Sequence, residues 1–379
     1  MPLLVAAVLS TALLATGLTA GVAAAQPAAA TTAARAATTG TARASVPWNR
    51  VGPGWILAEY TSARPGGGGS GPLELYLISP GGTKYQLARW PNFLTAPQLV
   101  AWSPDGQRVL FQASSGRSFE LLTLATGHVS TFARPAGVSP IGFTTPRGLA
   151  IVAIRPASTG YNLARYTLSG ALARQLGNST DGAALYTPSG LEFVTGARDG
   201  LKLVGNLGSL IRQLPVPHSS VNSCTPVRWW NSGTVLADCE PPGSAIARLW
   251  LVPVGGGRPT ALTPLRTGSR DLGDLDAWQL SSGLYLQSAG PCGVLQIFKQ
   301  AASGSISLVA VPHTMGDNHV LSALGSRLLI QAPTGCIGSN SLLWFNPANR
   351  AEQWLVRAPA SAIGITAAVP FYSRENGNL

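Results

Sequence analysis

The feature that most constrains the fold is the stretch Ala101–Phe111 (AWSPDGQRVLF), which recurs in weaker form along the chain. Trp102 ends an apolar run, Ser103–Gly106 supplies turn residues, and Val109–Phe111 opens a run of strand-forming side chains. Apolar runs that are separated by Asp-Gly are typical of a β-hairpin. The stretch therefore predicts a strand, a tight turn and a second strand.

Copies of this hairpin are marked by glycines that follow one apolar run and precede the next. The glycines are separated by 52, 42, 42, 43, 50 and 42 residues, and they are Gly54, Gly106, Gly148, Gly190, Gly233, Gly283 and Gly325. A second pair of apolar runs follows each copy, so each unit is expected to hold four strands, which we label A to D in chain order. A period of this length is typical of β-propeller blades.

Composition agrees with an all-β fold, because 44 Gly and 29 Pro punctuate short apolar runs and only 11% of the residues are charged. We predict a β-propeller of four-stranded blades over residues 46–372, with seven blades favoured over six or eight. Ile365–Tyr372 has the character of a strand A that no unit follows. We expect this strand to complete the first blade, in competition with Ser45–Trp48, and to leave residues 373–379 as a tail.

The sharpest copy, Trp102–Phe111, resembles the repeat of TolB-like β-propeller proteins, and the periodicity extends the resemblance over about residues 46–372. TolB itself has six blades and an additional N-terminal domain, whereas seven units and no such domain are visible in this sequence. The resemblance therefore does not imply a Tol-type role. In organisation the chain is most similar to small exported TolB-like proteins of actinobacterial type, a likeness that implies a location rather than a mechanism.

The N-terminal residues 1–25 are apolar and uncharged, and they end in Ala23–Ala25. This pattern predicts a signal peptide that is cut after Ala25, although no basic residues precede the apolar run. An uncleaved N-terminal anchor is the alternative, because the run is long enough to span a bilayer. Residues 26–45 are rich in Ala and Thr and are expected to form a flexible tether. The expected location is secreted, or the extracytoplasmic envelope of a bacterium.

Four cysteines in an exported protein suggest two disulfides. The repeat places Cys224 in strand A and Cys239 in strand B of the fifth unit, opposite each other across one hairpin. Cys292 and Cys336 fall in the B–C loops of the sixth and seventh units. We therefore predict one disulfide within a blade, Cys224–Cys239, and one between neighbouring blades, Cys292–Cys336.

A candidate binding site lies in the D–A connections of the second half of the chain. In a four-stranded meander these connections and the B–C loops emerge on one face, and the A–B and C–D turns on the other. Polar residues from successive D–A connections would thus surround one mouth of the central channel. They are His218, Arg266, Arg270, Asp271, Asp274, Asp276, His313, Asp317 and His319. The alternative is that they are ordinary polar residues of exposed loops.

The net charge of +11 comes almost entirely from arginine. Such a composition is also what a GC-rich genome tends to encode; functionally, it favours attraction to anionic envelope polymers or phospholipid headgroups. Nucleic acid is disfavoured by export and by the lack of a run of basic residues. Membrane contact is expected only through an uncleaved N-terminal segment.

The predicted function is that of a non-enzymatic cell-envelope scaffold, probably no more than inference from organisation allows if stated by class: a monomer that binds an envelope protein, a peptide or an anionic cell-wall polymer. No cofactor is expected, because the carboxylates around Asp271 lack the spacing of a calcium loop. No Gly-x-Ser-x-Gly motif is present. The alternative is a propeller hydrolase, lactonase or lyase that uses the His/Asp group, with a divalent ion such as Ca²⁺.

Overall fold

Antiparallel strand pairing dominates the structure, as the short apolar runs of the sequence lead one to expect. The computed structural model describes residues 45–63, 71–217, 223–241, 246–264, 273–290, 294–333 and 339–371. The chain divides into two units, Met1–Ala33 and Ala34–Leu379, and every described residue belongs to the second. The predicted signal segment, the tail 373–379 and almost all of the predicted tether lie outside the described residues.

The strands of the second unit form four-stranded blades, the first and last of which share one sheet. Blade one contains β28 (Gly364–Pro370), β1 (Ile56–Thr61), β2 (Leu73–Ile78) and β3 (Lys84–Trp90), and blade seven contains β24 (His319–Leu324), β25 (Arg327–Pro333), β26 (Asn340–Asn346) and β27 (Ala351–Val356). Short 3₁₀ turns, η1 (Trp48–Arg50) and η2 (Phe93–Thr95), flank β1 and precede β4.

The five blades between them follow chain order, each as a separate sheet. Blade two contains β4 (Gln98–Trp102), β5 (Arg108–Gln112), β6 (Ser118–Thr123) and β7 (Val129–Ala133), and blade three contains β8 (Ser139–Phe143), β9 (Ala150–Pro156), β10 (Tyr161–Thr167) and β11 (Leu172–Ser179). Blade four contains β12 (Leu185–Tyr186), β13 (Glu192–Ala197), β14 (Gly200–Gly205) and β15 (Leu210–Pro215). Blade five contains β16 (Ser223–Asn231), β17 (Thr234–Glu240), β18 (Arg248–Pro253) and β19 (Thr260–Ala261), and blade six contains β20 (Asp274–Leu280), β21 (Gly283–Ala289), β22 (Leu295–Gln300) and β23 (Ile306–Leu308).

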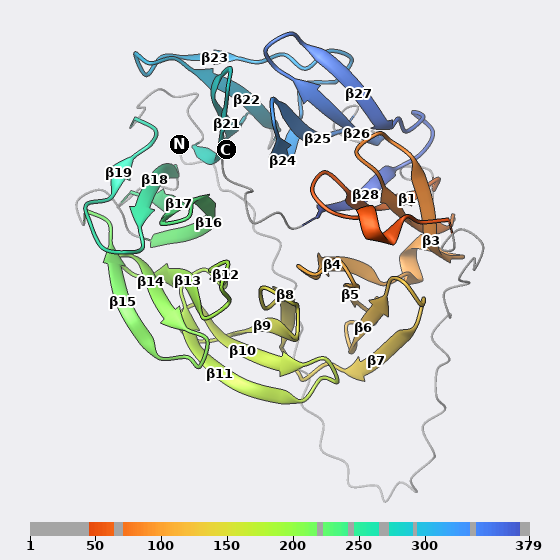
Figure 1. Cartoon of the computed structure of the whole chain (residues 1–379), viewed down its shortest axis with the longest axis horizontal. Helices are drawn as coiled ribbons and strands as arrows, with labels where there is room; N and C mark the ends of the chain where they lie inside the picture. The colour runs from red at the N-terminus through yellow and green to blue at the C-terminus, as the bar shows by residue number, and fades with distance from the viewer. Residues whose placement is uncertain are drawn as a thin grey trace, which may run out of the picture. The chain divides into compact units, whose positions relative to one another are not determined.

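Figure 1 shows these blades around a common centre, with strand A innermost and strand D outermost. The described strands thus give seven four-stranded blades, and the predicted all-β propeller is confirmed. Tryptophans near the ends of the inner strands, such as Trp102, Trp229 and Trp278, are buried between the sheets. They pack the blades together, which is the structural role expected from their place in the repeat.

The C-terminal strand completes the first blade, as predicted. β28 pairs antiparallel with β1, from Ile56 opposite Pro370 to Thr61 opposite Gly364. The competing segment Ser45–Trp48 forms no strand and leads instead into η1. Closure therefore joins strands from the two ends of the propeller sequence, which removes an exposed sheet edge.

The turn of the sharpest repeat packs against this closing segment. Gly106 has a φ of +74°, a conformation that glycine adopts without strain. A Cβ atom at this position would lie 2.7 Å from the Phe371 ring. Phe371 in turn packs edge-on against Trp102, with ring centroids 5.0 Å apart. The repeat that is best preserved in sequence thus contacts the residue that follows β28.

A β-bulge recurs in the inner strand of six blades. The strand pairing of β28, β4, β8, β16, β20 and β24 each skips one residue. The skipped residues are Thr366, Val100, Ile141, Val227, Leu275 and Leu321. A bulge changes the direction in which the next side chain points, so the residue that follows each bulge occupies an equivalent place around the centre.

One of the two predicted disulfides lies within the described residues. Cys224 on β16 is opposite Cys239 on β17 in the register, and their sulfur atoms are bonded. The predicted pairing within blade five is confirmed. Cys292 and Cys336 lie outside the described residues, so the predicted bond between blades six and seven stays a prediction.

Candidate functional site

Five of the predicted site residues are described, and most of them belong to strands rather than loops. Asp274 and Asp276 lie in β20, and His319 is the first residue of β24. His313 and Asp317 lie in the connection between β23 and β24, as expected. The strands begin earlier than predicted because a bulge adds a residue to each inner strand. His218, Arg266, Arg270 and Asp271 lie outside the described residues.

Asp276 forms an ion pair with Arg228, which lies on the inner strand β16 of the neighbouring blade. The same carboxylate oxygen accepts a hydrogen bond from the backbone N–H of Ala277 at 2.7 Å. The Arg228 guanidinium also lies over the Trp278 ring, 4.2 Å from its centroid. These contacts fix the pair in place, and the two side chains are only 11% and 22% exposed. Burial raises the pKa of Asp276, and Arg228 acts in the opposite direction.

The ion pair occupies a special position in the repeat. Arg228 and Asp276 each follow the extra residue of their bulge. The same position holds Ala101, Gly142, Ser322 and Ala367 in the other four bulged blades. Since a small residue satisfies the fold at this position, the two charged side chains are an addition that blades five and six make to the common scaffold.

His319 brings a third blade to this region. Its side chain is exposed and forms no hydrogen bond or ion pair with any residue that the structure describes. Surrounding protein nevertheless lowers its pKa, while the carboxyls of Asp276 and Asp317 act to raise it. Blades five, six and seven thus contribute Arg228, Asp276 and His319 from their inner strands. We call these three residues the mouth group.

Asp238 on β17 adds a carboxyl that sequence reasoning missed. Its Oδ1 atom is buried and has no hydrogen-bond partner among the described residues. Burial raises its pKa to about 7, and the nearby carboxyls of Glu240, Asp276 and Asp274 raise it further in that direction. Acidic groups therefore outnumber Arg228 in this part of the molecule. Arg228 was missed as well, although it interrupts the apolar strand Val227–Trp230.

The remaining predicted residues are occupied elsewhere. The Nδ1 atom of His313 lies 3.1 Å from Glu352 on the outermost strand β27. Asp317 accepts a hydrogen bond from the backbone N–H of Leu295 at 2.7 Å. Asp274 accepts one from the Ser288 hydroxyl at 2.5 Å. The structure does not bring these three side chains together with the mouth group.

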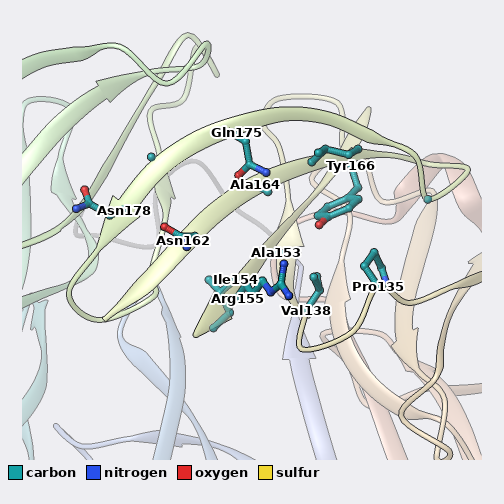
Figure 2. Close-up of a pocket in the computed structure, with 13 residues that line it drawn as sticks. Pro135, Val138, Ala153, Ile154, Arg155, Asn162, Ala164, Tyr166, Gln175 and Asn178 are labelled. Carbon is teal, nitrogen blue, oxygen red and sulfur yellow. The ribbon is translucent and has the colours of Figure 1, made fainter. Parts of the chain in front are cut away.

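A groove of about 780 Å³ lies on blade three, away from every predicted site residue. Figure 2 shows that its polar side chains come from adjacent strands: Arg155 from β9, Asn162 and Tyr166 from β10, and Gln175 from β11. Tyr166 and Ala164 also pack against the apolar side chains of blade two. The groove thus follows the junction of blades two and three.

Comparisons with known proteins identify the fold. No model of a known protein family matches the sequence, and no curated protein matches it. Among solved structures, the β-propeller domain of the Trilobed protease from Pyrococcus furiosus aligns with a TM-score of 0.53 at 11% identity, over 81% of this chain and 94% of that domain. The fold is a TolB-like β-propeller.

Two further neighbours are longer than this chain. The acylaminoacyl peptidase from Pyrococcus horikoshii aligns with a TM-score of 0.51 at 10% identity, over 82% of this chain and 52% of the peptidase. TolB from Acinetobacter baumannii aligns with a TM-score of 0.46 at 13% identity, over 83% of this chain and 66% of TolB. Identities this low show the fold alone, so no activity of these proteins is transferred to this propeller.

No helix in the described ranges combines the length and the apolar composition that crossing a membrane requires. The same ranges contain no group of three or more His, Cys, Asp or Glu residues that could hold a metal ion.

Proposed function

We propose that this protein is an exported, non-enzymatic component of a bacterial cell envelope, and that its mouth group binds a peptide segment of another envelope protein. The observation that carries the proposal is the Arg228–Asp276 pair beside His319, on the inner strands of three neighbouring blades. The fold needs only small residues at the positions of Arg228 and Asp276. Charged residues there supply polar partners at the channel without supporting the blades.

The chemistry of the mouth group favours a basic peptide over an anionic cell-wall polymer. Asp238, Glu240 and Asp276 lie close enough to influence one another's ionisation. A Lys or Arg side chain of the partner would find carboxyl groups there, and the exposed imidazole of His319 would add a hydrogen-bonding group. The net charge of +11 leaves other surfaces for an anionic polymer.

Binding is favoured over catalysis by how the carboxylates are held. Asp276 is committed to Arg228 and to the N–H of Ala277, and it forms no hydrogen bond with His319 among the described contacts. A general base that acts through His319 would need an orienting partner for the imidazole. A propeller hydrolase, lactonase or lyase stays the alternative prediction, because His218 and Asp271 lie outside the described residues.

The proposal is tested by crosslinking in intact cells. A photoreactive benzophenone residue in place of His319 should crosslink to an envelope protein. The same residue in place of Leu308, which is 60% exposed on the outer strand β23, serves as the control. Adding Asp276→Asn, which keeps the shape but removes the charge, should weaken the crosslink at position 319. An equal crosslink at position 308, or no effect of Asp276→Asn, would show that the mouth group is not the binding site.

Export is tested separately. N-terminal sequencing of the protein that is recovered from the envelope or the medium should begin at Gln26, since the predicted cleavage follows Ala25. Recovery of the intact N-terminus in the membrane fraction would support the anchor instead. Recovery in the cytosol alone would remove the basis for an envelope role.

A further inference from the structure

Exposed hydrophobic side chains are concentrated on blades three and four. Of ten large hydrophobic residues that the structure exposes, six fall between residues 149 and 211 and are 48% to 65% exposed. They are Leu149, Leu172, Leu191, Leu207, Leu210 and Ile211. Single exposed leucines are normal on protein surfaces, but a contiguous group marks a surface that contacts something else.

Three of these leucines lie at hairpin turns that emerge on one face of the propeller. Leu149 follows the turn from β8 to β9, Leu191 the turn from β12 to β13, and Leu207 lies in the turn from β14 to β15. These are A–B and C–D turns, so this face is opposite the D–A connections of the predicted binding site. Leu149, Leu191 and Leu207 are termed the leucine tips below.

Hydrogen bonds hold the leucine tips of the two blades together. The carbonyl of Leu191 accepts a hydrogen bond from the N–H of Asn206 at 2.8 Å. The Arg174 side chain on β11 donates to the carbonyl of Leu207 at 3.0 Å. The tips therefore belong to one surface that is built from both blades, rather than to independent loops.

A hollow of about 540 Å³ lies between these turns, and its lining carries positive charge. Arg147, Arg165, Leu149 and Asn206 are among the lining residues, and none of the lining residues is acidic. Arg165 donates to the carbonyl of Asn206 at 3.1 Å. The exposed side chain of Arg147 has no hydrogen bond or ion pair with the described residues. Two guanidinium groups thus line a hollow beside which leucines protrude.

We propose that this face docks on an anionic phospholipid surface, with one lipid headgroup in the hollow and the leucine tips inserted beside it. Guanidinium groups bind phosphate through paired hydrogen bonds, and leucines gain free energy at the boundary of headgroups and acyl chains. The exposed Arg174 and Arg212 flank the leucines and add charge of the same sign. This combination of one charge sign with protruding apolar turns fits an anionic membrane rather than the mixed surface of a protein.

The contact differs from the N-terminal membrane segment that the sequence suggests, and it goes beyond the proposed function. Because the hollow and the mouth group lie on opposite faces, the docked propeller would present the mouth group away from the lipid. The protein could then bind its partner while it stays at the membrane.

The test uses the full chain with vesicles of phosphatidylcholine, with or without phosphatidylglycerol. The apolar residues 1–25 are able to bring the chain to any vesicle, so the readout must be local. Hydrogen–deuterium exchange should slow at the turns 145–149, 188–192 and 205–209 when phosphatidylglycerol is present. The loop 113–117 between β5 and β6, which lies on the opposite face, should exchange at an unchanged rate.

Paired variants separate the apolar from the charged contribution. Leu191→Ser with Leu207→Ser should weaken the phosphatidylglycerol-dependent protection more than about tenfold in lipid concentration, because each inserted leucine contributes to binding. Arg147→Gln should weaken it about fivefold, the effect of one cation near an anionic surface. Leu94→Ser, at an equally exposed leucine in η2, and Arg117→Gln, in the loop on the opposite face, are the matched controls.

Three outcomes would overturn the proposal. Equal protection on vesicles without phosphatidylglycerol would remove the charge argument. Equal losses in the Leu94→Ser and Arg117→Gln controls would remove the assignment to this face. Protection by free glycerol phosphate at the same level, without vesicles, would show that the hollow binds a soluble anion and not a membrane.

Discussion

The junction of blades one and two and the junction of blades five and six each contain a buried carboxyl, but the two are held in different ways. Glu59 on β1 is 3% exposed and accepts a hydrogen bond from the N–H of Leu99 on β4 at 2.9 Å. No cationic side chain among the described residues pairs with it, and burial raises its pKa to about 8. Asp276 instead pairs with the guanidinium of Arg228 across its junction.

The difference separates a structural carboxyl from a charge kept at the channel. A carboxyl with a pKa near 8 is mostly protonated at neutral pH, so Glu59 serves as a neutral hydrogen-bonding group between the blades. Thr366, the bulge residue of β28, also contacts Glu59 and lowers its pKa to a smaller extent. The ion pair keeps a formal charge on either side of its junction, and a partner can recognise that charge.

The largest expected effect comes from breaking the first junction at its source. Deletion of residues 364–379 removes β28, and with it the pairing to β1 and the contact between Phe371 and Trp102. We expect a loss of several kcal/mol and a fall in Tm of more than about 10 °C. Deletion of residues 373–379 alone keeps β28 and is the control. Equal melts for the two deletions, measured by circular dichroism, would contradict closure by β28.

The second junction is broken by Arg228→Met. This change leaves Asp276 buried without its cation, and we expect the free energy of unfolding to fall by about 3 to 5 kcal/mol. Combining it with Asp276→Leu removes both charges, and most of the loss should be recovered. Urea unfolding of the two single variants and the double variant gives the coupling. Additive losses would mean that the two side chains do not stabilise each other.

The repeat makes much of the fold predictable, because glycine turns and apolar runs are local features. The register that they set placed Cys224 opposite Cys239 and left Ile365–Tyr372 as the closing strand, and both predictions are confirmed. These features depend on which residues follow one another, and a sequence shows that directly.

The buried carboxyls were not predictable in the same way. Glu59 is one polar residue in an apolar strand, and its partner Leu99 belongs to the next blade. Asp274 and Asp276 are two residues apart and would share a face in a regular strand. The bulge at Leu275 separates them, so that Asp274 bonds to Ser288 while Asp276 reaches Arg228. Which side chains meet at the channel thus depends on bulges, and nothing in the local sequence marks them.

A smaller effect, which depends on pH, distinguishes the two carboxyls. Because the pKa of Glu59 is higher in the folded protein than in the unfolded chain, folding becomes less favourable as pH rises from about 4 to about 8. Glu59→Gln keeps an oxygen that can accept the Leu99 hydrogen bond but does not titrate. We expect this variant to be more stable than the wild type at pH 8 by up to a few kcal/mol, and the difference to shrink by pH 5. A difference that stays constant with pH would mean that Glu59 is charged in the folded state.

The smallest expected effect concerns His319, and it tests whether the charge of Asp276 acts across to the third blade. Asp276 and Asp317 both raise the pKa of this imidazole against the effect of burial, and Asp276 contributes more. Asp276→Asn should therefore lower the pKa of His319 further, by less than about one unit, because the two groups form no direct ion pair. Asp317→Asn should lower it by a smaller amount. Nuclear magnetic resonance titration of the imidazole Cε1–H measures both shifts. If the carboxyl on blade six acts on blade seven in this way, a partner's cation that binds Asp276 will also shift His319, so the same titration reports when the mouth group is occupied.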